Sequence, residues 1–446
     1  MKSDPINFEA LDTWLQEQGQ NALSNAQRLL LQACLQSERV TYEQFAAEHN
    51  YSASYVRCGV AKELWRVLRA AAGERVTKSN CYSILTRLPL ALPAPTVPPA
   101  SVESQPDSDR LDYPNGAVPI NSRFYIPRLP IENRCKRAIL QPCTLLRLKA
   151  PHTMGKSSLL SQLLAHAQSQ GCITIRVNFQ AADTQVLSDL SRTLRWLCVQ
   201  ISQALELPSK LDQHWNEDLG YKMSCSLYMK KYLLPQVKQP FVLALDEVSV
   251  LFNYPDTSQE FFTMLRTWHE YTKVETAWQH LRLVLVQSTD SYVQLNVNQS
   301  PFNVGLGMSL TAFSLAEVEK LVALHPLDLT AEHLTDLHTY VAGHPYLIRL
   351  ALYHLTRQDL TFEALLTTAS GHNSVFRYHL QYLLWLLQEQ PELMSAMQQV
   401  LASAEPISLP QILGFKLRST GLVQLVGNQV QVSCPLYRDY LEEAIA

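Results

Sequence analysis

Residues 150–158 read A-P-H-T-M-G-K-S-S, between an apolar run at Cys143–Leu148 and a second apolar segment at Leu159–Ala165. They fit the pattern G-x-x-x-x-G-K-[ST] at seven of its eight places, since Ala150 replaces the first glycine. A buried strand, such a loop and the start of a helix, in this order, are typical of a phosphate-binding loop (P-loop). We therefore expect this loop to bind a purine nucleotide.

The residues of this loop differ in what they offer to phosphates. Gly155 has no Cβ, so the chain can turn there and direct its N–H groups and the following helix N-terminus at the phosphates. Lys156 supplies a positive charge to the β- and γ-phosphates. Ser157 is the expected Mg²⁺ ligand, with Ser158 as the alternative assignment. The expected nucleotide-binding residues of the loop are Ala150, Pro151, His152, Thr153, Met154, Gly155, Lys156, Ser157 and Ser158.

A second motif, F-V-L-A-L-D-E at 241–247, is an apolar run that ends in two carboxylates. A buried parallel strand has this pattern, and its C-terminal end faces the ligand. We interpret the motif as a Walker B element in which Asp246 holds Mg²⁺ through water. Glu247 would activate the attacking water, so Glu247 and Lys156 are the catalytic candidates. Taken singly, the run at 241–247 could be a buried strand that ends in a solvated acidic turn, and the loop at 150–158 could be a helix N-terminus with a surface lysine. Together, the two motifs predict ATP and Mg²⁺.

A third apolar run, L-R-L-V-L-V at 281–286, ends in Gln287, Ser288 and Thr289. At the end of a neighbouring strand, these polar groups could sense the γ-phosphate. The alternative is that they only form a turn, as Ser and Thr often do after a strand.

Length and composition indicate a multidomain protein. The 446 residues suffice for about three domains, and the net charge of −3 excludes a generally basic nucleic-acid binder or membrane-surface protein. No apolar stretch reaches the length of a membrane span, and M-K-S-D-P-I-N-F lacks the core of a signal peptide, so we expect a cytoplasmic protein without membrane contact. The nine cysteines include no C-x-x-C pair, which argues against a zinc site or a disulfide framework.

A proline-rich segment from Leu88 to Pro119 cannot form regular helix or sheet ladders and is typical of an extended linker. We expect a multidomain α/β protein whose P-loop NTPase core is a parallel α/β domain with a helical lid, between an all-α helix-turn-helix domain and a winged-helix domain. The predicted parts are the helix-turn-helix domain at 1–87, the linker at 88–119, the AAA-like ATPase core at 120–310, the lid at 311–371 and the winged-helix domain at 372–446.

The first 87 residues have the apolar spacing of helices, at about 7–18, 25–36, 41–48, 53–70 and 78–86. Within them, Thr41 and Ser52 are the expected caps of two helices that flank the turn His49–Tyr51. A short helix, a turn and a longer helix are the pattern of a helix-turn-helix.

The role of this helix-turn-helix is open between DNA and protein. If its exposed face enters a groove of DNA, Arg57, Lys62 and Arg75 are the expected contacts. However, seven basic residues against five acidic ones between Glu38 and Lys78 give a net charge of only +2. DNA binding through residues 41–78 and docking to a protein are therefore equally supported.

After the linker, strands and helices alternate as far as the third strand. The expected strand at Ile173–Phe179 and the helices at 184–206 and 258–271 complete a parallel sheet covered on both faces, with the nucleotide at the strand C-termini. Beyond Leu310, the pattern is wholly helical at 315–324, at 331–341 and from Gly343–Pro345 through His354. We expect this segment to form the lid.

Two lid residues are candidate phosphate contacts. Arg349 could reach the γ-phosphate, and His344 could approach the phosphates, although a histidine beside a Pro-turn is more often structural. Near the C-terminus, the short apolar runs Gly421–Leu425 and Gln429–Ser433 follow helices, as in a winged helix. This last part has few basic residues, so we expect it to pack against other parts of the protein rather than to read DNA.

Several segments together resemble the AAA-like ATPases of the signal-transduction (STAND-like) NTPase group, common in cyanobacteria. They are F-Y-I-P-R-L-P-I-E at 124–132, A-P-H-T-M-G-K-S at 150–157, L-D-E-V at 245–248, N-Q-S-P-F-N-V-G at 298–305 and G-H-P-Y-L at 343–347. The first ninety residues resemble the N-terminal helix-turn-helix domain of proteins associated with the vWA–MoxR system. This resemblance implies a nucleotide-gated switch that acts with effector proteins or by self-association in conflict or stress signalling.

The resemblance also implies that Tyr125 and Arg128 line the adenine side of the site. The chain departs from the family pattern at His152 and Thr153, where an arginine is frequent, and at Ser249, where an aspartate is frequent. Because none of these positions is a core Mg²⁺ ligand, we expect ATP and ADP binding with slow hydrolysis.

Three hypotheses of different class follow. The first is an ATP-dependent switch that changes the packing or oligomerisation of flanking domains; the second is a DNA-binding regulator modulated by nucleotide; the third is a nucleotide-binding scaffold without useful hydrolysis. An arginine from a neighbouring subunit could complete the site, and spacing does not choose among Arg266, Arg282 and Arg349.

Overall fold

The computed structural model describes residues 111–289 and 301–445, and from the first 110 residues it describes 25–36, 56–72, 81–85 and positions 11, 14, 15, 18, 23 and 76. The chain divides into two compact units, Met1–Gln105 and Pro106–Ala446. The division falls inside the segment predicted as the linker.

The N-terminal unit is helical in the described residues. Its elements are α2 (Asn25–Gln36), a π-helix (Val56–Ala61), α5 (Lys62–Ala72) and α6 (Cys81–Leu85). In α5, Leu64, Trp65, Val67 and Leu68 are buried because their spacing places them on one face of the helix. The helix predicted at 25–36 is confirmed, whereas the one predicted at 53–70 is divided between the π-helix and α5. The described residues do not include the helix predicted at 41–48, and they do not include Thr41, Ser52 or Arg75.

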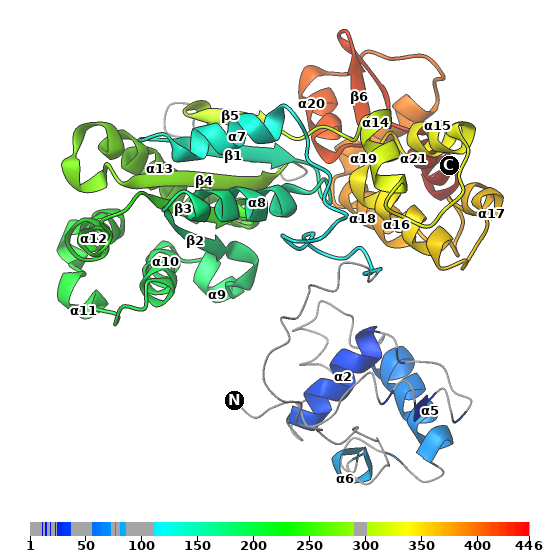
Figure 1. Cartoon of the computed structure of the whole chain (residues 1–446), viewed down its shortest axis with the longest axis horizontal. Helices are drawn as coiled ribbons and strands as arrows, with labels where there is room; N and C mark the ends of the chain where they lie inside the picture. Colours follow the sequence, from blue (N-terminus) through cyan, green and yellow to red (C-terminus); the bar gives the residue numbers. More distant parts are fainter. Residues whose placement is uncertain are drawn as a thin grey trace, which may run out of the picture. The chain divides into compact units, whose positions relative to one another are not determined.

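The second unit contains a five-stranded parallel sheet with the order β2-β3-β4-β1-β5. Its strands are β1 (Leu145–Ala150), β2 (Ile173–Asn178), β3 (Phe241–Asp246), β4 (Leu281–Ser288) and β5 (Leu306–Ser309). β4 lies between β1 and β3, so the ends of the P-loop strand, the third strand and the Walker B strand meet at one edge (Figure 1). The predicted parallel α/β core is confirmed, but β5 was not predicted.

Alternating side chains divide between the two faces of the sheet. Leu243, Leu245 and Leu283 belong to the core under α10 (Leu190–Ala204), α12 (Tyr221–Tyr228) and α13 (Pro255–Val274). Val242, Ala244 and Val284 belong to the core under α7 (Ile131–Leu140) and α8 (Lys156–Ser169). This two-sided burial explains why the strands are continuous apolar runs in the sequence.

The predicted helix at 184–206 is interrupted. A short helix, α9 (Thr184–Leu187), ends before Asp189, whose carboxylate accepts a hydrogen bond from the backbone N–H of Arg192 at 2.8 Å. This bond caps the N-terminus of α10, so a new helix starts where the apolar pattern alone predicts a continuous one.

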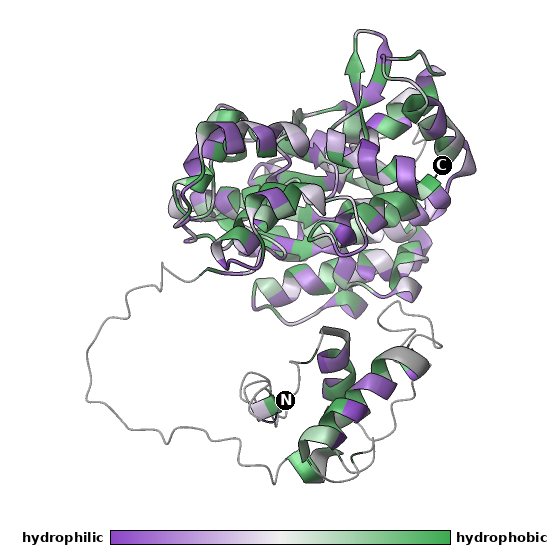
Figure 2. Ribbon diagram, turned by 90° about the vertical axis from the view of Figure 1, so that its right-hand side faces the viewer, coloured by the Kyte–Doolittle hydropathy of each residue, from purple (hydrophilic) through white to green (hydrophobic). Residues whose placement is uncertain are grey.

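From Leu315 onward, the second unit is mainly helical. The helices are α14 (Leu315–Val322), α15 (Ala331–Tyr340), α16 (Pro345–Thr356), α17 (Phe362–Thr367), α18 (Arg377–Gln388), α19 (Pro391–Leu401), α20 (Gln411–Thr420) and α21 (Pro435–Ile445). Their buried faces share one apolar core, and hydrophobic and hydrophilic residues alternate along the helices (Figure 2). β6 (Val423–Val426) and β7 (Gln429–Val432) form the predicted antiparallel hairpin. The winged-helix assignment of 372–446 stays a prediction.

Among the helices of the described residues, none combines the length and the apolar character needed to cross a membrane.

Candidate functional site

The loop between β1 and α8 has the backbone shape that its sequence predicts. Thr153 and Gly155 have positive φ angles of 57° and 84°, and α8 begins at Lys156. A Cβ on Gly155 would lie 2.7 Å from Nη2 of Arg128. The left-handed backbone favours glycine here, and any larger residue would also have to displace the Arg128 side chain.

The Lys156 ammonium folds back onto the loop. Its Nζ donates to the backbone oxygens of Ala150 and Pro151, at 3.1 and 2.9 Å, and to Oγ of Ser288 at 2.9 Å. Since the side chain is buried, these oxygens replace the water that its charge would otherwise keep. They hold the cation between the ends of β1 and β4, where the sequence predicts phosphate.

The Asp246 carboxylate at the end of β3 is fully buried. Its Oδ1 accepts the backbone N–H of Glu247 at 3.1 Å, and Oδ2 accepts the Ser157 hydroxyl at 3.4 Å. The two residues predicted to hold Mg²⁺, Ser157 and Asp246, are therefore together. Oδ2 also accepts two N–H groups of Arg176, Nε at 3.0 Å and Nη2 at 2.5 Å.

Glu247 lies beyond the end of β3 and lines the cavity described below. Its φ of 54° is in the left-handed region, which is uncommon for a residue other than glycine. Strain of this kind concentrates at functional sites, although here it only supports a role that the position of the carboxylate suggests independently.

The polar end of β4 contributes to the same edge. Ser288 contacts Lys156, and its backbone N–H donates to the Ser249 hydroxyl at 3.2 Å. Thr289 donates from its backbone to the oxygen of Ala150 at 3.1 Å and from its hydroxyl to the oxygen of Ser419, in α20, at 2.6 Å. Ser249 thus accepts a hydrogen bond from the end of β4.

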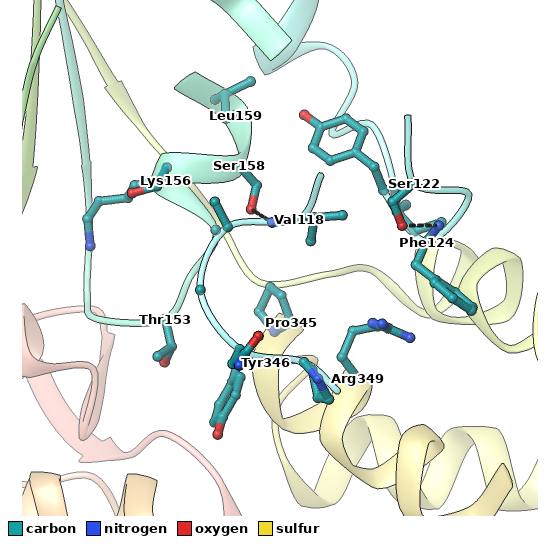
Figure 3. Close-up of a pocket in the computed structure, with 18 of the residues that line it drawn as sticks. Val118, Ser122, Phe124, Thr153, Lys156, Ser158, Leu159, Pro345, Tyr346 and Arg349 are labelled. Atoms are coloured by element: carbon teal, nitrogen blue, oxygen red, sulfur yellow. Dashed lines mark hydrogen bonds between the residues drawn. The ribbon is translucent and has the colours of Figure 1, made fainter. Parts of the chain in front are cut away.

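A cavity of about 330 Å³ opens beside the loop. It is lined by the P-loop, by Glu247, by residues 112–119 and by α16 of the predicted lid, through Pro345, Tyr346 and Arg349. Figure 3 shows Lys156 and Thr153 on one side and Arg349 beside Phe124 on the other. A ligand in this cavity would contact both the α/β core and the helical part.

Residues 112–119 line the cavity as a segment without helix or strand. The backbone N–H of Val118 donates to Oγ of Ser158 at 2.9 Å (Figure 3). Gln162 donates to the backbone oxygen of Ile120, just after the segment, at 3.0 Å. Ser158 is therefore engaged with this segment, which supports Ser157 as the Mg²⁺ ligand of the two.

Tyr125 and Arg128 both line the cavity. The Tyr125 hydroxyl donates to Glu132 at 2.7 Å, and burial raises its pKa, so it stays a donor. Arg128 donates to the backbone oxygens of Met154 and Thr311, at 2.5 and 3.0 Å, and so links the P-loop to the start of the predicted lid. Burial lowers the pKa of Arg128 to about 10, which leaves it charged at neutral pH.

The two candidate lid contacts differ in position. Arg349 lines the cavity, with its guanidinium carbon 4.0 Å from the Phe124 ring centroid and Nη1 3.0 Å from His325. His344 is buried beside His379, with ring centroids 4.8 Å apart, and is not among the cavity-lining residues. The phosphate-binding roles proposed for both stay predictions, and the surroundings of His344 suit its structural alternative better.

The P-loop also contacts the C-terminal helices directly. The His152 ring lies 5.0 Å from the Tyr382 ring of α18. A Cβ on Gly421, which follows α20, would meet Pro151 at 3.2 Å. A movement of the P-loop on ligand binding would therefore change its contacts with α18 and with the end of α20.

Of the three arginines considered for a neighbouring subunit's site, one is excluded by burial. Arg282 is buried near the start of β4 and donates to the oxygen of His280 at 2.6 Å, so its guanidinium cannot extend to another molecule. Arg266 pairs with Glu270 at 3.2 Å on the surface of α13.

The groups at this edge fit Mg²⁺ and a nucleotide. A hydroxyl and a carboxylate oxygen converge, a lysine lies beside them, and the loop backbone turns around a glycine. Oxygen ligands of this kind suit Mg²⁺, which keeps most of its waters. Within residues 111–289, 301–445 and the described parts of the N-terminal unit, no cluster of three His, Cys, Asp or Glu residues could hold another metal.

Sequence reasoning missed Arg176 and the segment 112–119. Arg176 is the one charged residue within I-T-I-R-V-N, an otherwise apolar or neutral strand, and that pattern could have drawn attention to it. The segment 112–119 was assigned to the linker because of its prolines, and its contacts with α8 are not visible in the sequence.

Two family models match this chain. Residues 113–443 match the model of a family described as AAA-like domain, and residues 6–88 match that of the vWA-MoxR associated protein N-terminal HTH. An uncharacterized WD repeat-containing protein of Synechocystis is 24% identical over 202 residues, 44% of this chain and 17% of that protein. The chain thus spans about a sixth of the length of that curated relative.

Among solved structures, the Walker-type ATPase of Pyrococcus abyssi is similar with a TM-score of 0.53 at 13% identity, over 71% of this chain and 96% of that one. The ORC2 protein of Aeropyrum pernix, in ADPNP–ADP complexes, has a TM-score of 0.43 at 16% identity, over 72% and 96%. At these identities, the likeness to the Pyrococcus protein shows the fold alone.

Proposed function

Because the chain belongs to the AAA-like domain family, we propose that it binds ATP with Mg²⁺, hydrolyses it slowly and uses the nucleotide state to change how its flanking parts pack. The observation that carries this proposal is the cavity beside the P-loop. It is lined by the α/β core, by residues 112–119 and by α16, so one ligand contacts all three.

The residues at the edge of the sheet have separate roles in this proposal. Lys156 would give up its hydrogen bonds to two backbone oxygens and bind the β- and γ-phosphates. Their negative charge attracts the ammonium group more strongly than a neutral carbonyl oxygen does. Ser157 and Asp246 would hold Mg²⁺, which neutralises phosphate charge during transfer. Glu247 would orient or deprotonate the attacking water from its place on the cavity wall.

The contacts around the P-loop support a switch rather than a passive scaffold. Arg128 joins Met154 to Thr311, His152 touches Tyr382, and Thr289 bonds to Ser419. A ligand shifts an equilibrium only through different contacts in two states, and these links offer such contacts. We propose that the lid at 311–371 and a winged-helix domain at 372–446 respond in this way, in signalling through effector proteins or self-association in the cytoplasm.

DNA binding is the other function considered for the N-terminal unit. In its described residues, Arg66 pairs with Glu63 at 2.6 Å and Arg69 donates to the oxygen of Val76 at 2.9 Å. These two guanidinium groups are engaged within the unit, so they do not favour DNA over protein, and contact through 41–78 stays a prediction.

The test combines nucleotide binding, phosphate release and light scattering on wild type, Lys156→Ala and Glu247→Gln. We expect Lys156→Ala to lose ATP affinity by about tenfold or more, because a charge-assisted contact to phosphate contributes about 1.5–3 kcal/mol. Glu247→Gln should keep ATP bound, lower turnover by at least about a hundredfold and favour the assembled form.

Equal ATP binding by wild type and Lys156→Ala would contradict nucleotide binding at this loop. Binding without any Lys156-dependent phosphate release, and without a change of mass in Glu247→Gln, would support a non-hydrolysing scaffold instead.

A further inference from the structure

A guanidinium group lies at the position where the proposed metal site needs a free carboxylate. Arg176, from β2, donates Nε and Nη2 to Oδ2 of Asp246 at 3.0 and 2.5 Å. The same oxygen accepts the hydroxyl of Ser157 at 3.4 Å. Arg176 therefore shares the carboxylate oxygen that faces the other Mg²⁺ ligand.

The local fold explains how this arginine reaches the site. Ile175 and Val177 pack on the side of the sheet covered by α10, so the alternate residue Arg176 points to the side of α8. β2 pairs with β3 so that Asn178 lies opposite Asp246. Arg176 therefore lies opposite Ala244, which is two residues before the end of the Walker B strand. Its Nη1 also donates to Oγ of Ser161, in α8, at 3.3 Å.

The ion pair between Arg176 and Asp246 compensates the charge of a buried carboxylate. The Asp246 side chain is 1% exposed, and a buried carboxylate without a partner is costly. Arg176 supplies that partner and keeps about a third of its own side chain exposed, at 34%. It can therefore withdraw toward solvent or toward Ser161 when another cation takes its place.

We propose that Arg176 acts as a resident cation at the metal position, so that Mg²⁺ binds with the nucleotide only by displacing Arg176 from Asp246. The inference rests on the proposed nucleotide function and assigns to this residue a role in setting how strongly Mg²⁺ and nucleotide bind together. The oxygen that accepts Arg176 is also the one that faces Ser157 and could accept a Mg²⁺-bound water, and the two cations would repel each other at this short separation.

The test measures ADP affinity by calorimetry in EDTA and at saturating Mg²⁺, in wild type and in Arg176→Met. The ratio of the two dissociation constants reports the coupling between metal and nucleotide. Arg176→Met should raise this ratio by about fivefold or more, because the metal no longer displaces an ion pair and instead neutralises the Asp246 carboxylate that is left without a partner. Arg176→Lys, with one ammonium in place of a two-pronged guanidinium, should fall between wild type and Arg176→Met.

Arg192→Met is the matched control. Arg192 is an exposed arginine near the start of α10, and the same substitution there should leave the ratio unchanged. Circular dichroism checks that each variant is folded, and Arg176→Lys, which retains a positive charge beside Asp246, carries the test if Arg176→Met does not fold.

The outcomes separate this inference from the proposed function. An unchanged ratio in both Arg176 variants would overturn it, as would a parallel loss of affinity with and without Mg²⁺, since Arg176 would then bind phosphate directly. If wild type itself binds no ADP in either condition, or binds it as Lys156→Ala does, the proposed nucleotide function fails first.

Discussion

At the scale of single residues, the P-loop depends on one glycine. Gly155 has a φ of 84°, and a Cβ added to it would lie 2.7 Å from Nη2 of Arg128. Gly155→Ala should weaken ADP binding by about tenfold or more, since a left-handed backbone alone costs an alanine about 1–2 kcal/mol and Arg128 must also move. Calorimetry with ADP measures this loss.

Ala150→Gly is the control for that variant, because it restores the first glycine of the sequence pattern at a buried strand end. It should bind ADP about as wild type does. Equal binding by Gly155→Ala and wild type would show that the loop does not approach phosphate as the structure suggests.

Residue types and spacing predicted that three residues of the candidate site lie together, while their roles stay predictions. Lys156, Ser157 and Asp246 come together as expected because strand C-termini in a parallel sheet share one edge. Arg176 was not predictable in the same way, since its contact with Asp246 depends on β2 pairing with β3 in one register. A sequence gives the face of a strand on which a residue lies but not the neighbouring strand.

At the scale of elements, the helical part buries titratable groups between α16, α18 and α21. His379 accepts or donates a hydrogen bond at 2.8 Å to the Tyr437 hydroxyl, and its ring lies beside that of His344. Burial is the main cause that lowers the pKa of His379 to about 3, and the pKa of His344 falls well below its ordinary value for the same reason. Both histidines are therefore neutral in the folded protein.

The sign of the pH dependence follows from these shifts. Between about pH 6.5 and 4, the unfolded chain binds protons on these histidines and the folded chain does not, so acidification favours unfolding. The free energy of unfolding should fall with acidification by up to about 1.4 kcal/mol per pH unit for each such histidine. Urea titrations from pH 7 to 4 measure this fall.

His379→Gln provides the comparison, because glutamine can still bond to Tyr437 but does not titrate. Between pH 6.5 and 4, the free energy of unfolding of His379→Gln should decrease less steeply than that of wild type. The difference in slope should correspond to the uptake of about one proton on unfolding. Identical slopes for the two proteins would show that His379 is protonated in the folded state.

Most elements of the second unit follow from hydrophobic periodicity, but their ends do not. β3 and β4 are recognisable as continuous apolar runs because both faces are covered. β5 escapes detection because it has only four residues, L-G-M-S, and its partner β1 alone specifies it. The break between α9 and α10 depends on the Asp189 cap, a single side chain within a favourable helical pattern.

At the scale of the whole molecule, contacts within the second unit join the proposed nucleotide site to the helical part. Arg128 bridges the P-loop and the start of the lid, and Thr289 bridges β4 and α20. The match of residues 113–443 to one family model includes all of these elements, so the coupling we propose lies within a single family unit.

Hydrogen–deuterium exchange with and without ATP·Mg²⁺, in wild type and in Lys156→Ala, tests the central claim most directly. The account predicts slower amide exchange in wild type at 150–158, at 112–119 and in α16, which all line the cavity, with no change in Lys156→Ala. Protection confined to 150–158 would contradict the coupling of core and lid, and equal protection in both proteins would contradict nucleotide binding at this loop.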